Sequence, residues 1–332
     1  MRRENKKPTL ADRMRGAIWG QFIGDAACMG SHWIYDLAEL AWRFPAGVNG
    51  FETTREGHYH FGKQPGDQTH YGDAALLLLE SVAKQGRFLA EDFGCRFIAL
   101  MSSDSYGGYR DHATKGTLSR YREFREEHPT ARYDFQSGAD DDQPATVTRL
   151  APVVVAHWLD KRLDEVVTAL TRVCQDNERA IAYAQGDALI LWHLLAGEEL
   201  EQAAAAAREA LVEAGAAGRE VAGRIETALG LQGSTVTEAT LRFGQSCPLA
   251  NSFPAALYAA RLHRDDPAAA ILATARAGGD NAARAAMIGA WLGARLGVEA
   301  FPEEWRQQLT ARRTIEQGVE RLVALQTERH AA

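Results

Sequence analysis

The sequence predicts an all-α fold, and two observations lead to this prediction. Apolar residues recur at the three- and four-residue spacing of amphipathic helices along most of the 332 residues. No Asn-Gly or Asp-Gly pair joins two alternating apolar runs, and strand and helix patterns do not alternate. We expect about a dozen helices. They should form a single domain over 1–332, with 1–8 and 329–332 flexible, because no Pro/Ser-rich linker or short repeat divides the chain.

The first helix boundaries follow from capping residues. Thr9 followed by Asp12 matches a capping box and predicts that a helix begins there. Asp73 is expected to cap the apolar run 74–84, and Gly86 is expected to end that helix.

Further along the chain, proline and asparagine mark helix starts. Pro144, Pro254 and Pro267 each suit the first turn of a helix. Asn177 is expected to open another helix, and the Ala- and Glu-rich residues 198–230 have high helix propensity. The remaining boundaries are the end of a helix at Gly278–Gly279, the start of the next near Asp280, and a last helix from about Ile315 to Thr327.

Two long segments lack a helical pattern. Residues 44–72 are rich in Gly, His and aromatic side chains, and 128–143 contains the acidic triplet Asp140–Asp142. Segments of this length in a compact domain are usually functional or disordered, and aromatic residues argue against disorder. We expect the triplet to be a solvated loop with an N-cap rather than a cation site.

Composition restricts the class of protein. The net charge of −7 argues against a nucleic-acid-binding protein, which would show a basic face. The four cysteines form no CxxC pair, so neither a disulfide framework nor a zinc ribbon is expected. No apolar run follows the basic N-terminus, and none reaches the ~18 residues of a membrane span. We therefore expect a cytoplasmic protein with no membrane or nucleic-acid partner, and the oligomeric state stays open.

Glycine recurs every four residues in two predicted helices. The first stripe is Gly16, Gly20 and Gly24, and the second is Gly289, Gly293 and Gly297. Glycine inside a helix costs about 1 kcal/mol relative to alanine, so the stripes predict close contact between helix backbones. Asp25 adjoins the first stripe and Asp280 begins the helix of the second. If these helices cross, the two carboxylates converge.

A polar cluster precedes the apolar run 74–84. It consists of Asp67, His70, Tyr71 and Asp73, all within seven residues. One interpretation is a polar loop before a capped helix. The other is a helix N-terminus that faces a cleft, where backbone N–H groups favour phosphate or carboxylate and His70 acts as a general acid or base. The residues alone leave both open.

Three segments together resemble the ADP-ribosylglycohydrolase family. They are RGAIWGQFIGDAACMG at 15–30, THYGDAALLLLES at 69–81 and AGGDNAARAAMIGAWLGARLGVEAFPEEW at 277–305, in which GGD at 278–280 matches a family motif. The resemblance covers about residues 12–306. It implies an all-α orthogonal bundle with a cleft in which two magnesium ions orient an ADP-ribosyl group. Water then cleaves the bond at the anomeric carbon of the ribose.

The magnesium-binding positions depart from the family pattern. The family's TDDT is replaced by Thr69, His70, Tyr71 and Gly72, and its DTDT by Asp280, Asn281, Ala282 and Ala283. Only Asp280 remains as a metal-binding acid, with Thr69 as an oxygen donor. A hard dication needs about six oxygen ligands. We therefore expect no two-magnesium site and no cofactor, although the resemblance implies magnesium. The pattern resembles the family branch that contains the J-type lens crystallins.

Arg284 lies four residues after Asp280 on one predicted helix, which is the favoured order for an ion pair. A guanidinium at this position is expected to replace part of the positive charge of the missing metals. It is also suited to hold a phosphate or carboxylate through two hydrogen bonds. The alternative is an ordinary salt bridge on the surface.

Three functions remain open. The first is hydrolysis of an N- or O-glycosidic bond in a small-molecule or ADP-ribosylated substrate. In that case Asp73 or His70 activates water, and the carboxylate of Asp280 stabilises the oxocarbenium charge. The second is a catalytically silent relative that binds a nucleotide or sugar phosphate, and the third is an enzyme acting on an amide or guanidino compound. The expected substrate contacts are Asp25, Thr69, Tyr71, Asn281 and Arg284.

Overall fold

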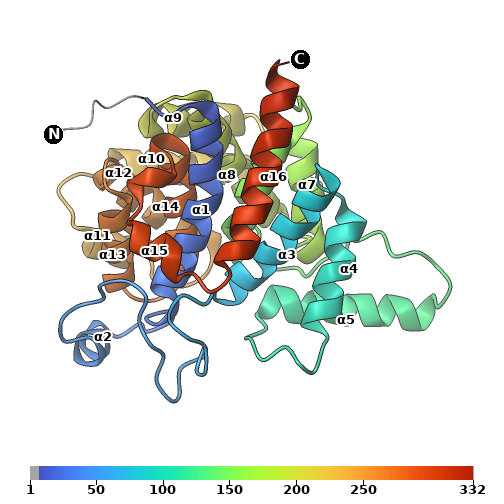
Figure 1. Cartoon of the computed structure of the whole chain (residues 1–332), viewed down its shortest axis with the longest axis horizontal. Helices are drawn as coiled ribbons and strands as arrows, with labels where there is room; N and C mark the ends of the chain where they lie inside the picture. The colour runs from blue at the N-terminus through green and yellow to red at the C-terminus, as the bar shows by residue number, and fades with distance from the viewer. Residues whose placement is uncertain (1–6, 332) are drawn as a thin grey trace.

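The computed structural model describes residues 7–331, and they form an all-α protein, as the sequence predicts. Within this range there are sixteen α-helices, two 3-10 helices and no strand, arranged as a bundle of crossing helices (Figure 1). The α-helices are α1 (Leu10–Met29), α2 (Leu37–Arg43), α3 (His70–Gln85), α4 (Ala90–Met101), α5 (His112–Glu127), α6 (Ala151–Ala156), α7 (Leu163–Cys174), α8 (Glu178–Ala196), α9 (Leu200–Val212), α10 (Gly215–Gly230), α11 (Val236–Phe243), α12 (Leu249–Leu262), α13 (Pro267–Arg276), α14 (Asn281–Leu296), α15 (Glu303–Gln308) and α16 (Arg312–Ala331). The 3-10 helices are η1 (Val147–Arg149) and η2 (Val298–Ala300).

Most of the predicted helix boundaries are confirmed. Thr9 forms a capping box with Asp12 at the start of α1. Asn177 caps α8 through its side chain. Gly86 ends α3 with a positive φ of 69°, a conformation in which glycine avoids the steric cost of a side chain. Local hydrogen bonds of this kind involve neighbours in sequence, which is why the sequence predicts them.

The predicted cap of α3 is wrong. Thr69, not Asp73, is the N-cap, because the Thr69 hydroxyl accepts the Tyr71 N–H at 3.1 Å. The helix therefore begins at His70, and Asp73 lies in its first turn.

Two proline positions also differ from the prediction. Pro144 precedes η1 rather than opening an α-helix, and Pro152 is the proline in the first turn of α6. Pro254 lies inside α12, which starts five residues earlier at Leu249. A proline there has no N–H to donate to the preceding turn. Its full burial in the core shows that tertiary packing outweighs this local cost.

The acidic triplet is bonded to the region around α8. Asp140 accepts the Asn177 side-chain amide at 2.7 Å, and Asp142 pairs with Arg179. Asp141 accepts the Gln143 N–H at 2.9 Å. The triplet therefore joins the loop 128–143 to the start of a helix rather than lying free in solvent.

The glycine stripes form the contact between α1 and α14, as predicted. A Cβ added to Gly20 would lie far inside 3.0 Å of the Gly289 carbonyl, and one added to Gly16 would approach the Gly293 carbonyl equally closely. The third contact is Gly24 with the backbone of Ala285. α1 lies near the middle of Figure 1, with α16 beside it. The helix that contains Asp25 is thereby held directly against the helix that follows Asp280.

From the sequence, both ends of the chain, 1–8 and 329–332, are expected to be flexible. Residues 1–6 and 332 lie outside the described range. Residues 329–331 continue α16, and the Pro8 carbonyl accepts a hydrogen bond from the Arg13 guanidinium at 2.6 Å.

Buried apolar side chains from Met14 to Val323 form one core cluster. The division of the chain into domains stays a prediction. None of the described helices is both long and apolar enough to cross a membrane.

Candidate functional site

The turn at 278–280 joins α13 to α14 and is the centre of the candidate site. Its two glycines have φ values of 68° and 66°, a conformation that other residues rarely adopt. The segment after α1 pairs with this turn. The Trp33 N–H donates to the Gly279 carbonyl, and the Gly279 N–H donates to the Ile34 carbonyl, both at 2.8 Å. This pairing holds His32 next to the turn.

Asp25 is bonded to the residue that caps α3. The Thr69 N–H and hydroxyl donate to its two carboxylate oxygens at 2.6 and 2.5 Å. Asp25 is 1% exposed. Burial raises the pKa of Asp25 to about 6, although the hydrogen bonds from Thr69 act to lower it. These two predicted substrate contacts are therefore bonded to each other and join α1 to α3.

The raised pKa of Asp25 predicts how stability depends on pH. The folded protein binds the Asp25 proton more tightly than the unfolded chain, so this group stabilises the fold below pH 3.8, and that contribution is lost as the pH rises through 6. The free energy of unfolding of wild type relative to Asp25→Asn should fall by up to about 3 kcal/mol between pH 4 and 7. Urea unfolding across this range measures it. Asp134→Asn, at an exposed position, controls for the loss of one charge. If the free energy of unfolding changes with pH by the same amount in wild type and in Asp25→Asn, the raised pKa of Asp25 is contradicted.

Asp280 is the N-cap of α14 and is fully buried. The Tyr71 hydroxyl donates to one of its carboxylate oxygens at 3.3 Å. The other oxygen lies 3.7 Å from the His32 Nδ1 and has no hydrogen-bond partner. Burial raises the pKa of Asp280, and the charge of Arg284 opposes this rise. The structure thus brings Tyr71, Asp280 and His32 together.

Arg284 is buried, with 0% of its surface exposed, so the interpretation as a surface salt bridge is wrong. Its guanidinium donates to the Gly278 carbonyl and, at 3.2 Å, to the Gln245 carbonyl. The direct ion pair with Asp280 is not seen, because the Asp280 carboxylate contacts Tyr71 instead. Arg284 therefore holds the turn in place through backbone carbonyls, and its Nε has no partner.

Asn281 ties the start of α14 to the end of α1. Its side-chain amide donates to the Ser31 carbonyl and hydroxyl at 3.2 and 3.0 Å and to the Ala275 carbonyl at 3.1 Å. Its side-chain oxygen lies 3.4 Å from the His32 Nδ1. The amide predicted to contact substrate is thus occupied by contacts within the fold.

His70 begins α3 and faces Asp111, the N-cap of α5. The His70 Nε2 lies 3.5 Å from the Asp111 carboxylate, and neither ring nitrogen of His70 has a hydrogen-bond partner. Burial acts to raise the pKa of Asp111, but the adjacent His70 and the hydrogen bonds from Thr114 outweigh it and hold this pKa below its usual range. Asp111 is a site residue that the sequence analysis missed.

Asp73 lies apart from this buried group. Its carboxylate pairs with the Lys63 ammonium at 2.8 and 3.0 Å and accepts the Tyr106 hydroxyl at 2.8 Å. These residues line a hollow of about 600 Å³ beside Phe61. The structure therefore does not bring Asp73 into contact with Asp280.

His32 and His60 are further residues that the sequence analysis missed. One ring nitrogen from each of His32, His60 and His70 lies within 4.8 Å of one from each of the others. The only signal in the sequence is the histidine-rich character of 44–72. It gives no indication that His32 lies beside this segment, because that contact depends on how the segment packs against the end of α1.

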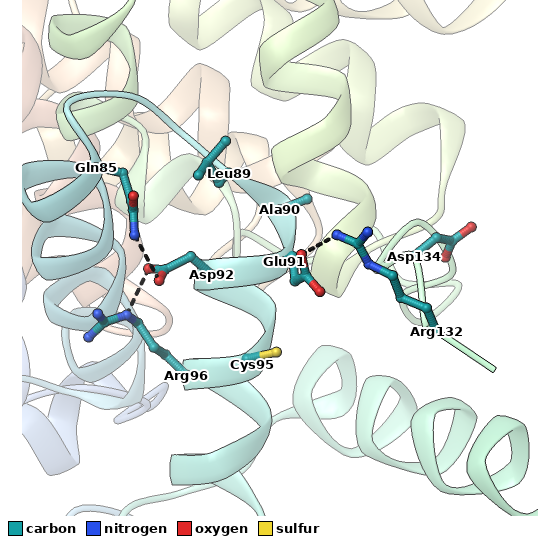
Figure 2. Close-up of a pocket in the computed structure, with 9 residues that line it drawn as sticks. All are labelled: Gln85, Leu89, Ala90, Glu91, Asp92, Cys95, Arg96, Arg132 and Asp134. Atoms are coloured by element: carbon teal, nitrogen blue, oxygen red, sulfur yellow. Dashed lines mark hydrogen bonds and ion pairs between the residues drawn. The ribbon is translucent and has the colours of Figure 1, made fainter. Parts of the chain in front are cut away.

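A separate pocket lies beside α4, with a volume of about 730 Å³ (Figure 2). Its charged side chains other than Asp134 are bonded to other lining residues. Asp92 accepts from Gln85 and Arg96 at 3.1 and 2.8 Å, and Glu91 pairs with Arg132. None of the predicted site residues lines this pocket. It is therefore not the candidate site.

The residues around Asp280 do not fit two magnesium ions. His70 and Tyr71 present an imidazole and a phenol at positions where the resemblance calls for carboxylates. The buried guanidinium of Arg284 adds fixed positive charge close to Asp280. Magnesium prefers oxygen ligands, commonly one or two carboxylates among them. One carboxylate beside a guanidinium does not supply that environment.

Comparison with known proteins agrees with this fold. The model of the ADP-ribosylglycohydrolase family matches residues 6–332, so the chain belongs to this family. It is similar to Crystallin J1A of Tripedalia cystophora, with 24% identity over 318 residues that cover 94% of this chain and 96% of the relative. Crystallin J1B of the same organism is 23% identical over 303 residues, covering 89% and 91%. A solved structure described as an ADP-ribosylglycohydrolase-related protein complex has a TM-score of 0.68 and 21% identity over 96% of this chain and 99% of that one, which confirms the fold.

Proposed function

We propose that the protein hydrolyses an N- or O-glycosidic bond in an ADP-ribosyl or related ribosyl compound without two magnesium ions. The observation behind this proposal is a concentration of unpartnered polar atoms around Asp280. In the described part of the chain, eight of the fifteen buried side-chain nitrogen and oxygen atoms without a hydrogen bond belong to this site. They are atoms of His32, Trp33, His60, His70, Asp280 and Arg284.

Such atoms are costly in a purely structural protein. An unsatisfied buried polar group costs roughly 1–3 kcal/mol, and several at one place would destabilise the fold substantially. A bound ligand with hydrogen-bonding groups would satisfy them. His70 and Asp280 lie in the family's THYGD and GGD segments, which supports a ribosyl compound as that ligand.

The geometry supports distinct roles for the buried residues. His70 is placed to take a proton from water, because the Asp111 carboxylate beside its Nε2 would stabilise the imidazolium that forms. The Asp280 carboxylate would stabilise positive charge at the anomeric carbon. Asp73 is less suited to act as the base, since Lys63 and Tyr106 already occupy its carboxylate.

The site is closed in this structure. His70, Asp111, Asp280 and Arg284 are each at most 4% exposed. His60, from the irregular segment 44–69, stacks on His70 with ring centroids 5.7 Å apart. Entry of a ribosyl substrate therefore requires this segment to move.

A second candidate function is that of a catalytically silent relative that binds a nucleotide or sugar phosphate. The two similar proteins named as crystallins favour it. The closed site does not distinguish the two functions, because a nucleotide needs the same rearrangement as a substrate to reach buried Asp280.

Release of ADP-ribose tests these two functions directly. We expect wild type to release it from a substrate with an N- or an O-glycosidic bond. His70→Gln and Asp280→Asn should lower the rate by roughly a hundredfold or more. His128→Gln, at an exposed position, is the matched control and should retain the wild-type rate. No release from either substrate, combined with a higher midpoint of thermal unfolding in ADP-ribose, would replace this proposal with the silent binding protein.

Magnesium titration tests the mechanism separately. Because of the missing carboxylates and the buried Arg284, we expect calorimetry to show no tight magnesium binding and the rate to be unchanged by added magnesium. Two tight sites in wild type that disappear in Asp280→Ala would overturn the proposed mechanism and restore the two-magnesium reaction.

A further inference from the structure

Three histidines from three separate segments converge in the core. His32 follows α1, His60 belongs to the irregular segment 44–69, and His70 is the first residue of α3. They are 0%, 2% and 4% exposed. A ring nitrogen of each lies within 4.8 Å of one from both others. Buried histidines are usually hydrogen-bonded, so a cluster in which only the His32 Nδ1 has hydrogen-bond partners requires an explanation.

The unpartnered nitrogens are the first part of that explanation. The Nε2 of His32 and both ring nitrogens of His60 and His70 are buried and make no hydrogen bond. The His32 and His60 rings stack with centroids 5.4 Å apart, and those of His60 and His70 with centroids 5.7 Å apart. These five unpartnered nitrogens belong to three imidazole rings that lie against one another, and one nitrogen of each ring lies within 4.8 Å of one from each of the other two.

The neighbours of these histidines are the second part. The His32 Nδ1 faces Asp280 at 3.7 Å, and the His70 Nε2 faces Asp111 at 3.5 Å. Histidines that bind a metal usually direct their second nitrogen at a carboxylate or carbonyl, which fixes the ring and raises its basicity. Each of these two histidines thus has a carboxylate near one ring nitrogen, and its other ring nitrogen has no hydrogen-bond partner.

The environment of His32 and His60 also favours the neutral imidazole, the form that binds metals. Burial and the neighbouring histidines lower the pKa of His32 well below its usual value, and burial followed by the effect of His70 lowers the pKa of His60. Trp33 covers the cluster, with its ring stacked on His32 at 4.2 Å. The surrounding groups exclude water and leave the lone pairs available.

We propose that His32, His60 and His70 form a binding site for a divalent transition metal of the zinc class. Imidazole nitrogens suit zinc, copper and nickel, whereas magnesium and calcium prefer oxygen. A tetrahedral zinc with Zn–N bonds of about 2.0–2.1 Å places its nitrogen ligands roughly 3.4 Å apart, so the histidines close by no more than about 1.4 Å on binding. Three protein ligands leave the fourth position for water.

This site goes beyond the proposed function and does not depend on it. The metal binds whether or not a ribosyl compound is hydrolysed. Where both hold, His70 would bind the metal instead of acting as the general base, and the metal would supply the lowered pKa of a water at its fourth position. Magnesium plays no part in either case.

Metal titration of the full chain, stripped with a chelator and measured without substrate, tests the proposal. We expect wild type to bind one zinc ion per chain, counted by elemental analysis after dialysis. Cobalt(II) should give the visible absorption bands of tetrahedral coordination. His60→Gln and His70→Gln should weaken zinc binding at least a hundredfold. His112→Gln is the matched control, because His112 adjoins Asp111 in sequence but is exposed, and it should bind zinc like wild type.

Three results would overturn the proposal. They are the absence of stoichiometric zinc in wild type, the absence of tetrahedral cobalt bands in wild type, and an equal affinity in wild type and His60→Gln. If a variant fails to fold, as judged by circular dichroism, the two wild-type measurements still decide. Because no substrate is present, a failure here leaves the hydrolysis proposal standing, and a failure to release ADP-ribose leaves the metal site standing.

Discussion

Replacing Gly20 with leucine is expected to prevent stable folding. A Cβ at this position would lie far inside 3.0 Å of the Gly289 carbonyl, a separation that real Cβ atoms essentially never show. The obstacle is the backbone of α14, which cannot turn aside as a flexible side chain would. We expect a loss of more than about 3 kcal/mol, above the usual range for overpacking, measured by urea unfolding. Gly293→Leu should have the same effect, because its Cβ would meet the Gly16 carbonyl.

Gly223 provides the matched control for this prediction. It also lies inside a helix, α10, but it is exposed and a Cβ there would meet nothing within 4 Å. Gly223→Ala should keep the wild-type stability or raise it by up to about 1 kcal/mol, since alanine is the better helix former. If Gly20→Leu unfolds at the wild-type midpoint, the glycine stripes are not the contact between α1 and α14.

Removal of the Arg284 side chain should be nearly as damaging. Arg284→Ala takes away two hydrogen bonds to the carbonyls of Gly278 and Gln245 and leaves the buried Asp280 carboxylate without its nearby cation. Breaking a buried charge arrangement typically costs about 3–5 kcal/mol, because an uncompensated charge remains. Urea unfolding measures the loss.

Two further variants separate this electrostatic effect from lost packing. Arg313→Ala, at an exposed position on α16, should change the stability by less than about 0.5 kcal/mol. Asp280→Asn combined with Arg284→Met should recover part of the loss, because it removes both charges and retains much of the volume. If an anionic ligand raises the midpoint of thermal unfolding of wild type, the same ligand should not raise the midpoint of Arg284→Ala. An unchanged stability and an unchanged ligand response would show that Arg284 does not act as a buried cation.

The helices were predictable where their signals are local. Thr9 and Asn177 cap helices through side chains that bond to backbone two or three residues away, and Gly86 ends α3 through its own φ. The short helices α2 and α15 were not predicted, because six or seven residues contain too little periodicity. Pro254 was assigned to a first turn on local preference, whereas packing in the core places it inside α12.

The candidate site was predictable only in part. The segments that contain Asp25, Thr69, Tyr71 and Asp280 meet, since the glycine stripes bring α1 against α14 and Thr69 bonds to Asp25. The pairing expected for Asp280 and Arg284 is absent, although their helical spacing favours it. Spacing determines which side chains are within reach of each other, but the surrounding partners determine which bonds form.

The sequence by itself determined the all-α class, the close contact of the two glycine helices, and the family through its GGD and THYGD segments. These features depend on local periodicity, on the absence of a side chain, or on motifs that are read directly. Only the tertiary structure decided that Arg284 bonds to the turn at 278–280, that Asp111 faces His70, and that His32, His60 and His70 converge. The physical reason is that each of these contacts joins backbone or side chains positioned by packing, and His32 and His60 reach each other across an irregular segment with no periodic pattern to predict where it lies.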